Sequence, residues 1–444
     1  MRARVGLPPG PREPAAIQLL EWTYRPLPFL ERCARRYGEA FTVRLPGFGA
    51  YVYLSSPELI KQVFTGDASL LEAGKGNRIL EPLLGMHSVL LLDGAEHLRQ
   101  RRLLLPPFHG ERMQAYAKLM REITCASLDT WPIGTPFSLH PQMQAITLDV
   151  ILRAVFGLDE GAEMRELAKL LVALFAPPPF LFSFLPLMTT DLPLSPYRKF
   201  LRLKGEVDRA LYAIIAERRR ADAADRTDIL SLLLAARDEE GRPMSDAELR
   251  DELVTMIAAG HETTATALSW AFERILATPE VAARLDAELA SACGSDFDPT
   301  RAGALPYLDA VIKETLRLRP IIPLVVRQLK EPYQIAGHLL PAGAHVAPCI
   351  WLTQRRADLY PDPERFFPER FLDRKIDPYT WLPFGGGIRR CIGMAFAQFE
   401  MTIVLATVLG RLRLRLAPGV PVRTVRRSIT FAPSGGTRVI AERR

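Results

Sequence analysis

The sequence has little of what marks several classes of protein. Its five cysteines are far apart, odd in number and include no Cys-x-x-Cys pair, so it predicts neither a disulfide framework nor a zinc site. Its most apolar stretch, 180–188, is far shorter than the roughly 18 residues that a membrane span needs. The first residues lack the apolar core of a signal peptide. We therefore expect a cytoplasmic protein with no membrane span.

Basic residues outnumber acidic ones, but they are spread thinly. The 57 Lys and Arg against 50 Asp and Glu leave a net charge of +7, without a long basic block or a basic stripe interleaved with aromatic residues. Nucleic-acid binding is therefore not expected, whereas an anionic cofactor or an acidic protein partner would suit the excess. A hydrophobic share of 48% and a charged share of 24% are typical of a folded globular protein and exclude a disordered chain.

The pattern along the chain predicts one large domain, 1–444, that is mainly α with a small β portion. Residues 1–25 are rich in proline and arginine and are predicted to form a loosely held arm. Alternating apolar residues in 41–54 predict two short strands joined by a turn, and most of 57–330 has helical periodicity. Short strands joined by glycine and proline follow after residue 331, and no repeat or linker divides the sequence.

Two long helices are the best-marked elements. The first has a capping box, Ser245 followed three residues later by Glu248, and its periodicity continues to about Leu276. That length, about 45 Å at 1.5 Å per residue, predicts a helix that crosses a whole domain. The second helix, 394–409, is predicted to end at Gly410.

The segment that points to chemistry is 384–393, FGGGIRRCIG. Three adjacent glycines permit a tight backbone that bulkier residues would forbid. Cys391 then stands at the start of the second long helix, where the helix dipole and free N–H groups stabilise a thiolate. Such a thiolate can approach a large flat ligand, and Arg389 can reach an anionic group on it. A lone cysteine is more commonly a buried structural residue, so only the whole ten-residue context favours a ligand site.

This segment resembles the haem-binding signature F-x-x-G-x-R-x-C-x-G of the cytochrome P450 superfamily at every fixed position. The resemblance implies the fold of that family, a mainly helical triangular prism with a long central helix that activates oxygen. It implies haem b as the cofactor and O2 as the co-substrate. Cys391 would be the thiolate ligand of the iron, donating electron density that favours O–O cleavage. Phe384, Arg389 and Gly393 would help to bind the haem.

Residues 259–264, AGHETT, lie inside the first long helix and weaken it. Glycine in a helix interior costs about 0.5–1 kcal/mol relative to alanine, and threonine can turn its hydroxyl to the carbonyl four residues earlier. Alone, these would be ordinary polar residues of a kinked core helix. The segment also resembles the family's oxygen-activation motif A-G-x-[D/E]-T-[T/S], which implies that Glu262 and Thr263 form a proton-delivery pair. His261 falls at the variable position of that motif and is given no role.

A third motif is weak by itself and gains meaning from the resemblance. Glu314 and Arg317 are three residues apart on one helical face, a spacing that usually means a surface ion pair. In the family such a pair joins a later arginine, here Arg370, in a buried network beneath the haem that supports folding and haem retention. One departure is Gln354-Arg355, where the family often has His-Arg. That site is expected to be peripheral and to affect only a local contact.

A fourth motif places basic residues at helical spacing. His97 and Arg101 are four residues apart and alone would be a solvated helix face. The resemblance implies that this pair binds the haem propionates together with Arg389 and Arg327.

The residues expected around the substrate are mostly apolar. The candidate pocket residues are Leu80, Leu83, Leu84, Ala258, Ala259, Ile322, Val325 and Thr430. Of these, only Thr430 would offer a polar side-chain contact. The apolar loop 175–196 fits a lid over the pocket and burial in the core equally well. We therefore expect a largely hydrophobic substrate such as a terpenoid, a fatty acid or a steroid.

The resemblance implies a monooxygenase that hydroxylates or epoxidises its substrate. No flavin domain is recognisable in 444 residues, so electrons are expected from a ferredoxin and ferredoxin reductase, or from a flavodoxin-type donor. Arg99, Arg102 and Arg390 are candidates for docking an acidic donor, and equally for solvated surface residues. The alternatives are a peroxide-dependent peroxygenase or isomerase of the same fold, which often lacks the acid–threonine pair, and a non-catalytic haem sensor. A monomer is expected.

Overall fold

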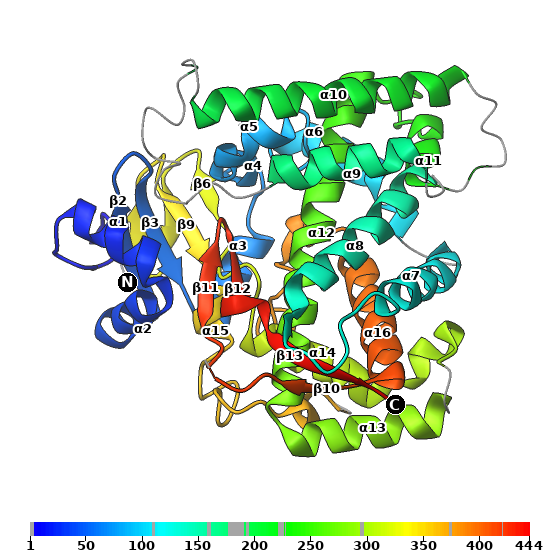
Figure 1. The fold of residues 1–444 in the computed structure, drawn as a ribbon. Helices are drawn as coiled ribbons and strands as arrows, with labels where there is room; N and C mark the ends of the chain where they lie inside the picture. The colour runs from blue at the N-terminus through cyan, green and yellow to red at the C-terminus, as the bar shows by residue number, and fades with distance from the viewer. Residues whose placement is uncertain are drawn as a thin grey trace.

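A long helix, α12 (Asp246–Leu276), runs through the middle of the molecule, and other helices pack around it (Figure 1). The computed structural model describes residues 4–108, 112–157, 161–175, 191, 195–220, 226, 228–293, 297–372, 375–419 and 421–444. Most of these residues are helical, and the strands form small sheets. The predicted class, mainly α with a small β portion and a long central helix, is confirmed.

The start of α12 is fixed by local hydrogen bonds. The Glu248 N–H donates to the Ser245 hydroxyl oxygen (3.2 Å), and the Ser245 N–H donates to the Glu248 carboxylate (2.7 Å). This capping box satisfies two N–H groups that have no partner within the helix. The helix ends at Leu276, as predicted, and packs against α8 (Leu139–Phe156), α14 (Pro306–Leu318) and α16 (Met394–Arg411). It therefore forms the centre of the core.

The remaining helices pack around α12 or, like α1 and α2, beside the strands within 40–54 (Figure 1). They are α1 (Ala15–Tyr24), α2 (Pro26–Tyr37), α3 (Pro57–Thr65), α4 (Ala73–Gly76), α5 (Glu81–Leu84), α6 (Gly94–Leu104), α7 (Arg112–Leu128), α9 (Ala162–Phe175), α10 (Pro196–Arg220), α11 (Ile229–Ala235), α13 (Pro279–Cys293) and α15 (Ile350–Thr353). Figure 1 shows α10 across one end of α12 and α13 near the other. Helix α8 packs along α12 and contributes polar side chains, such as Gln144, that contact it.

Helix α16 is the one described helix with the length and apolar composition of a membrane span. More than half of that 18-residue window is buried inside the protein, where the helix packs against α7 and α12. It therefore has the character of a core helix. The prediction that it ends at Gly410 is wrong by one residue, because Gly410 lacks the positive φ of a helix-ending glycine and the helix continues to Arg411.

Within the described residues, the strands form four small sheets. The largest has the strand order β2-β3-β9-β6-β4. The two strands predicted in 41–54 are confirmed as β2 (Ala40–Leu45) and β3 (Gly49–Leu54), which are antiparallel. The remaining strands are β1 (Arg4–Val5), β4 (Leu71–Glu72), β5 (Phe137–Ser138), β6 (Arg327–Leu329), β7 (Tyr333–Ile335), β8 (His338–Leu340), β9 (His345–Pro348), β10 (Leu412–Leu416), β11 (Thr424–Arg427), β12 (Thr430–Pro433) and β13 (Arg438–Arg443).

The first 25 residues are not the loosely held arm that the sequence predicts, where the structure describes them. Thr42 of β2 anchors them, since its hydroxyl donates to Pro8 O (2.8 Å) and its N–H donates to Pro9 O (3.0 Å). Gln18 of α1 is nearly fully buried, and its side-chain oxygen accepts from the Arg44 N–H (2.9 Å). Proline lacks an N–H but keeps its carbonyl, so a proline-rich segment can still accept hydrogen bonds beside a strand.

Candidate active site

The segment before α16 forms a tight loop against helix α3. The Cys391 N–H donates to Phe384 O (3.0 Å) and closes the loop. A Cβ on Gly387, whose φ is +62°, would lie 2.2 Å from Phe64 O, and a Cβ on Gly386 would lie 2.3 Å from the Phe64 ring. These two positions therefore require glycine because the loop lies directly on α3. The tight backbone predicted for the glycine run has this protein contact as its cause.

Cys391 lies at the end of this loop, just before Gly393 caps α16. Its free side chain is exposed, yet burial among surrounding atoms raises the pKa of the thiol. The Gly393 N–H, Arg101 and Arg390 lower that pKa. The Cys391 sulfur is thus accessible but surrounded by protein atoms. We infer that it faces a recess of the protein and not open solvent. A thiolate there would be stabilised by a bound cation such as a metal ion.

The middle of α12 contains an accessible point in a mostly buried helix. Ala259 is exposed, although most residues along the helix are buried. The Thr263 hydroxyl donates to Ala259 O (2.5 Å), the back-bonding that the residue type predicts. Gly260 faces α8, where a Cβ would lie 3.3 Å from Ile151. At this level α12 therefore presents an accessible surface with a hydroxyl beside it.

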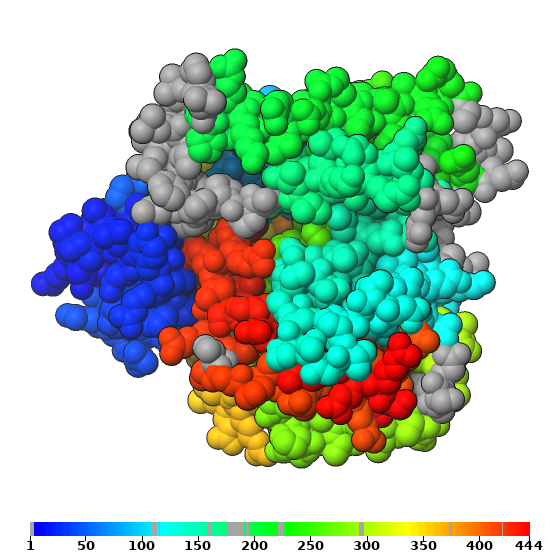
Figure 2. Space-filling view, in the orientation of Figure 1, coloured from blue at the N-terminus to red at the C-terminus, as the bar shows by residue number. Residues whose placement is uncertain are grey.

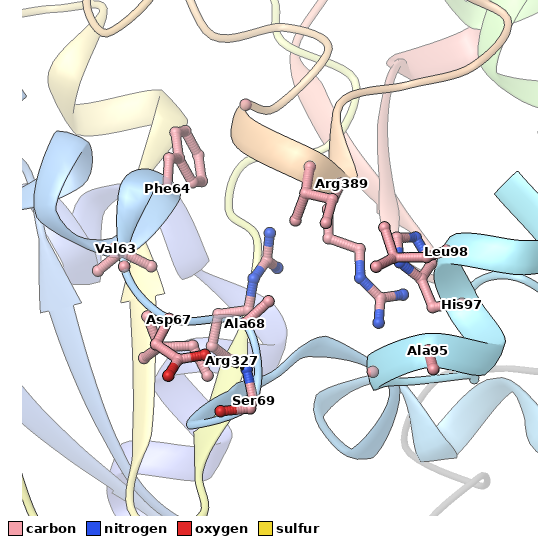
Figure 3. A pocket seen from close by; sticks show the side chains of 15 residues that line it. Val63, Phe64, Asp67, Ala68, Ser69, Ala95, His97, Leu98, Arg327 and Arg389 are labelled. Carbon is pink, nitrogen blue, oxygen red and sulfur yellow. Dashed lines mark hydrogen bonds between the residues drawn. The ribbon is translucent and has the colours of Figure 1, made fainter. Parts of the chain in front are cut away.

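A cavity of about 290 Å³ lies between α3, α6 and β6, and three basic residues line it (Figure 3). Arg327 extends from β6, Arg389 comes from the loop before α16, and His97 comes from α6. Figure 3 shows the Arg389 side chain extending toward His97, with Arg327 across the same space. Burial lowers the pKa of each arginine to about 10, so both stay charged at neutral pH. Burial, then Arg389, Arg101 and Arg327, lower the pKa of His97 to about 3.

The two cavity arginines carry more positive charge than their nearest acceptors neutralise. Arg389 donates to the carboxylate of Asp93 (2.7 Å) and to Val89 O (3.0 Å), whereas Arg327 donates to Val326 O (2.8 Å). Buried charges are stable when they meet an opposite charge. A ligand with two carboxylates would supply it. A basic cavity near a cysteine that faces a recess fits haem, whose propionates are anionic and whose iron accepts a thiolate.

Of the four residues predicted to bind the propionates, His97, Arg327 and Arg389 line the cavity. Arg101 does not line it, but lies close enough to His97, Arg389 and Cys391 to lower the pKa of each of them. Because His97 is neutral at pH 7, it can donate a hydrogen bond to a carboxylate but adds no charge.

The Glu314, Arg317 and Arg370 side chains meet in the core. Arg317 contacts Glu314 through two hydrogen bonds (2.6 and 2.9 Å), and Arg370 Nε donates to Glu314 Oε1 (3.1 Å). Both Glu314 and Arg317 are fully buried. The Phe367 N–H also donates to Glu314 (2.9 Å), so this carboxylate holds α14 and the segment around 367–370 together.

Gln354 is not the peripheral residue that the sequence suggests. It is fully buried, its side-chain oxygen accepts from the Leu382 N–H (2.7 Å), and its amide donates to Arg317 O (2.9 Å) and Leu316 O (3.2 Å). The last carbonyls of a helix have no partner within it, and Gln354 supplies one at the end of α14. The departure from His-Arg therefore affects the core.

The Glu262 carboxylate faces α8 and β11, whereas the Thr263 hydroxyl donates to Ala259 O. Gln144 Nε2 donates to Glu262 Oε2 (2.6 Å), and Glu262 Oε1 lies 3.6 Å from His140 Nε2 and 3.7 Å from Arg427 Nε. Burial raises the pKa of Glu262, while Arg427, Gln144 and Thr266 lower it. Sequence reasoning missed His140, Gln144 and Arg427, since no local pattern links residues so far apart in the chain.

The candidate substrate residues differ in accessibility. Ala259 is exposed, the half-buried ones are Leu80, Leu83, Ala258, Ile322 and Val325, and Leu84 and Thr430 are buried. The Thr430 hydroxyl donates to Arg427 O (2.8 Å), so its hydrogen goes to the β11–β12 turn. The apolar loop predicted at 175–196 lies, apart from its ends and residue 191, outside the described residues.

The arginines proposed for partner docking differ from one another. Arg99 is neither available for docking nor solvated. Its side chain is mostly buried and forms ion pairs with Asp238 and Glu248 (2.6 Å each). The long helix α12 begins beside these acids, which explains the pairing. Arg102 is exposed and contacts exposed Glu239, and Arg390 is exposed.

Comparisons with known proteins agree with the fold. The sequence profile of the cytochrome P450 family matches residues 8–437. Cytochrome P450 135B1 of Mycobacterium tuberculosis is 44% identical over 440 residues, which cover 98% of this chain and 91% of that protein. Cytochrome P450 138 of the same species is 38% identical over 448 residues, covering 99% and 97%.

Solved structures give the same result. A cyanobacterial CYP120A1 with retinoic acid bound superposes with a TM-score of 0.86 at 26% identity, covering 99% of this chain and all of that one. The haem domain of cytochrome P450DA has a TM-score of 0.87 at 22% identity, covering 100% and 99%, and shows the shared fold.

The fold and the site define a haem-dependent oxidoreductase. The chain belongs to the cytochrome P450 family and is a monooxygenase. Haem iron is the cofactor of that family, whose members in general take electrons from redox partners and act on hydrophobic substrates. The relatives described above are bacterial.

Proposed function

We propose that this chain is a haem-thiolate monooxygenase that hydroxylates or epoxidises a largely hydrophobic small molecule, such as a terpenoid, a fatty acid or a steroid. Cys391 would hold haem b through its thiolate, and the haem would supply the chemistry that inserts one atom of O2 into the substrate. The observation that carries it is the accessible sulfur of Cys391 in a desolvated recess, near a cavity with two buried arginines.

Haem iron, when bound, supplies the redox chemistry that activates O2. Arg327 and Arg389 bind its carboxylates, and neutral His97 adds a hydrogen bond. Phe384 and Gly393 shape the loop around the ligand cysteine.

The proton is handled by Glu262 and Thr263. Burial raises the pKa of the Glu262 carboxyl, so it holds a proton closer to neutral pH than an exposed glutamate does. The Thr263 hydroxyl, which donates to Ala259 O, lies beside the accessible stretch of α12 and is the group that passes the proton on. The acid and the hydroxyl are the pair that peroxide-dependent relatives often lack, which favours O2 over peroxide as the oxidant.

The Glu314–Arg317–Arg370 network is assigned to folding and haem retention. It is buried, and Arg317 also donates to Gln354 O (2.7 Å), which ties it to the chain that leads to the cysteine loop. We assign the whole of 1–444 to one catalytic domain, acting as a cytoplasmic monomer.

An apolar substrate is supported by the candidate pocket residues that keep some exposed surface. Ala258, Ala259, Ile322 and Val325 bring no charge to their exposed surfaces. The cyanobacterial relative of known structure is described with retinoic acid bound, a largely apolar molecule. A ferredoxin with its reductase, or a flavodoxin-type donor, supplies the electrons, and Arg102 and Arg390 are the exposed basic candidates for its docking.

The ligand assignment is tested by the reduced carbon-monoxide difference spectrum. The purified protein should show the Soret band of a haem-thiolate, and Cys391→Ala should lose it. Cys125→Ala, at a free half-buried cysteine of α7, is the matched control and should keep the band. An unchanged spectrum in Cys391→Ala would refute the assignment. Titration with terpenes, fatty acids and steroids, followed by the low-to-high spin shift, then identifies the substrate class.

A further inference from the structure

The carboxylate of Glu262 is held on the side of α12 that faces α8 and β11. Its Oε2 accepts a hydrogen bond from Gln144 Nε2 (2.6 Å), and Arg427 Nε lies 3.7 Å from Oε1. The neighbouring Thr263 hydroxyl instead donates to Ala259 O. The acid therefore has a different set of contacts from the hydroxyl that follows it in the sequence.

The tautomer of His140 in this cluster follows from its neighbour. Arg427 Nη1 lies 3.2 Å from His140 Nδ1, and a guanidinium group can only donate, so Nδ1 accepts. Burial, then Arg427 and His261, lower the pKa of His140 to about 4, so the ring is neutral at pH 7 and carries its hydrogen on Nε2. That nitrogen lies 3.2 Å from Thr266 Oγ1 and 3.6 Å from Glu262 Oε1. The N–H is thus on the side of the ring that faces the acid.

A second cavity, of about 330 Å³, lies between α8 and the β11–β12 hairpin, and His140, Gln144 and Arg427 line it. Ser138, His140, Gln144 and Arg427 supply its polar surface. Figure 2 shows the C-terminal strands and the α8 segment meeting at the molecular surface on this side. The Arg427 side chain is 34% exposed and connects solvent to the acid. A polar cavity of this size has room for several water molecules with protein partners.

We propose that this cavity is the water-filled route by which protons reach Glu262 from solvent, and that His140, Gln144 and Arg427 are positioning residues that hold the carboxylate at its inner end. A proton leaves a hydronium ion in the cavity, an O–H bond forms at a Glu262 carboxylate oxygen, and the water left behind exchanges with solvent. This inference rests on the proposed role of Glu262 as a proton carrier.

The charges around Glu262 suit loading and release of a proton. The charged and titratable groups that face it are His140 from α8 and Arg427 from β11, with His261 beside His140 on α12. Burial favours the protonated acid, while the Arg427 cation and the Gln144 amide favour the carboxylate. These opposed effects keep either protonation state accessible. The arrangement also explains why Arg427 reaches inward although much of its side chain could extend into solvent.

The first test follows the protonation of Glu262 itself and needs no turnover. The infrared C=O band of the acid, identified by its loss in Glu262→Gln, is titrated with pH in the protein as purified. Arg427→Gln should move the disappearance of this band to higher pH, because the cation that favours the carboxylate is gone. Arg427→Lys keeps a cation and should restore a titration close to wild type. Arg423→Gln, at an exposed arginine just before β11, is the matched control and should change nothing.

The second test follows the route. Gln144→Leu removes the amide and makes the cavity wall apolar. It should slow substrate oxidation by about tenfold, below the roughly 10²- to 10⁴-fold that a general acid contributes directly, and should enlarge the solvent deuterium isotope effect. The carbon-monoxide spectrum and the substrate-induced spin shift should stay as in the wild type.

The outcomes separate the two proposals. If Arg427→Gln and Gln144→Leu both leave the infrared titration and the isotope effect unchanged, the route is wrong. If the wild type lacks the haem-thiolate spectrum, the proposed function fails, while the infrared titration still reports whether Arg427 and Gln144 control the acid.

Discussion

The side-chain oxygen of Gln354 accepts a hydrogen bond from the backbone N–H of Leu382 at 2.7 Å. Leu382 lies two residues before Phe384, whose carbonyl closes the loop that ends at Cys391. On its other side, Gln354 binds the last carbonyls of α14, the helix that carries Arg317. One buried amide therefore joins the Glu314–Arg317 pair to the cysteine loop.

Replacing Gln354 by leucine should weaken this connection. Gln354→Leu keeps the volume but leaves the Leu382 N–H and two carbonyls without partners, at about 1–3 kcal/mol for each buried group. We expect a loss of at least about 3 kcal/mol in unfolding free energy, together with lower haem content. Urea unfolding of the apoprotein and the haem-to-protein absorbance ratio measure the two effects. Gln114→Leu, at an exposed position of α7, is the control and should stay within about 0.5 kcal/mol of wild type.

Gly387→Ala should disrupt the cysteine loop. The added Cβ would lie 2.2 Å from Phe64 O, and a φ of +62° strains any residue with a Cβ. Such backbone strain alone costs of order 1–3 kcal/mol, so the thermal midpoint and the haem-thiolate band should both fall. Gly410→Ala is the contrast, since nothing lies within 4 Å of its Cβ inside helix α16. Alanine there should stabilise by about 0.5–1 kcal/mol, and equal behaviour of the two variants would argue against the packing described for α3.

Arg317→Ala should be among the most damaging single substitutions. Among the described residues, it leaves the fully buried Glu314 carboxylate with Arg370 and the Phe367 N–H as its partners. Removing one partner of a buried pair costs about 3–5 kcal/mol, so little haem-loaded protein should be recovered. Arg202→Ala breaks an exposed pair with Glu206 and should cost under about 1 kcal/mol. Normal yield and haem content in Arg317→Ala would contradict the structural role.

The features that the sequence predicts well are local ones. The capping box that marks the start of α12 involves only Ser245 and Glu248, three residues apart. The alternation that predicts β2 and β3 lies within residues 41–54. Motif residues such as Glu314 and Arg317 are three apart, so their contact depends mainly on one helix forming.

The features that the sequence does not predict depend on distant partners. Pro8 and Pro9 are held by Thr42, Gln354 by Leu382 and Arg317, and Glu262 by Gln144 and Arg427 (Gln144 is 118 residues away). No periodicity or capping signal marks such contacts. They arise only when tertiary packing places an unpaired backbone group or carboxylate beside a polar side chain.

Acid should destabilise the protein partly through His261. This residue is buried beside Thr147, whose hydroxyl lies 3.1 Å from its Nδ1, and burial followed by Arg427 lowers the pKa of His261 to about 4. In the unfolded chain the imidazole binds a proton near pH 6.5, whereas in the folded protein it does not. Because the unfolded state then binds more protons, this contribution to stability falls as the pH drops from about 6.5 toward 4.

His261→Gln removes this titration while keeping a polar side chain of similar reach. Between pH 7 and pH 5 the wild type should lose about 2 kcal/mol more unfolding free energy than the variant. The buried carboxyls with raised pKa values, Glu252, Glu262 and Glu400, act in the opposite direction but are common to both proteins, so the difference isolates the histidine. Thr124→Val, which removes a buried hydroxyl that donates to Met120 O (2.7 Å) within α7, is the control, because it should lower stability at every pH and keep the wild-type acid dependence. Urea unfolding at steps of half a pH unit measures the unfolding free energy of each protein. If its dependence on pH is the same for His261→Gln and wild type, this imidazole is protonated in the folded state as it is in the unfolded chain.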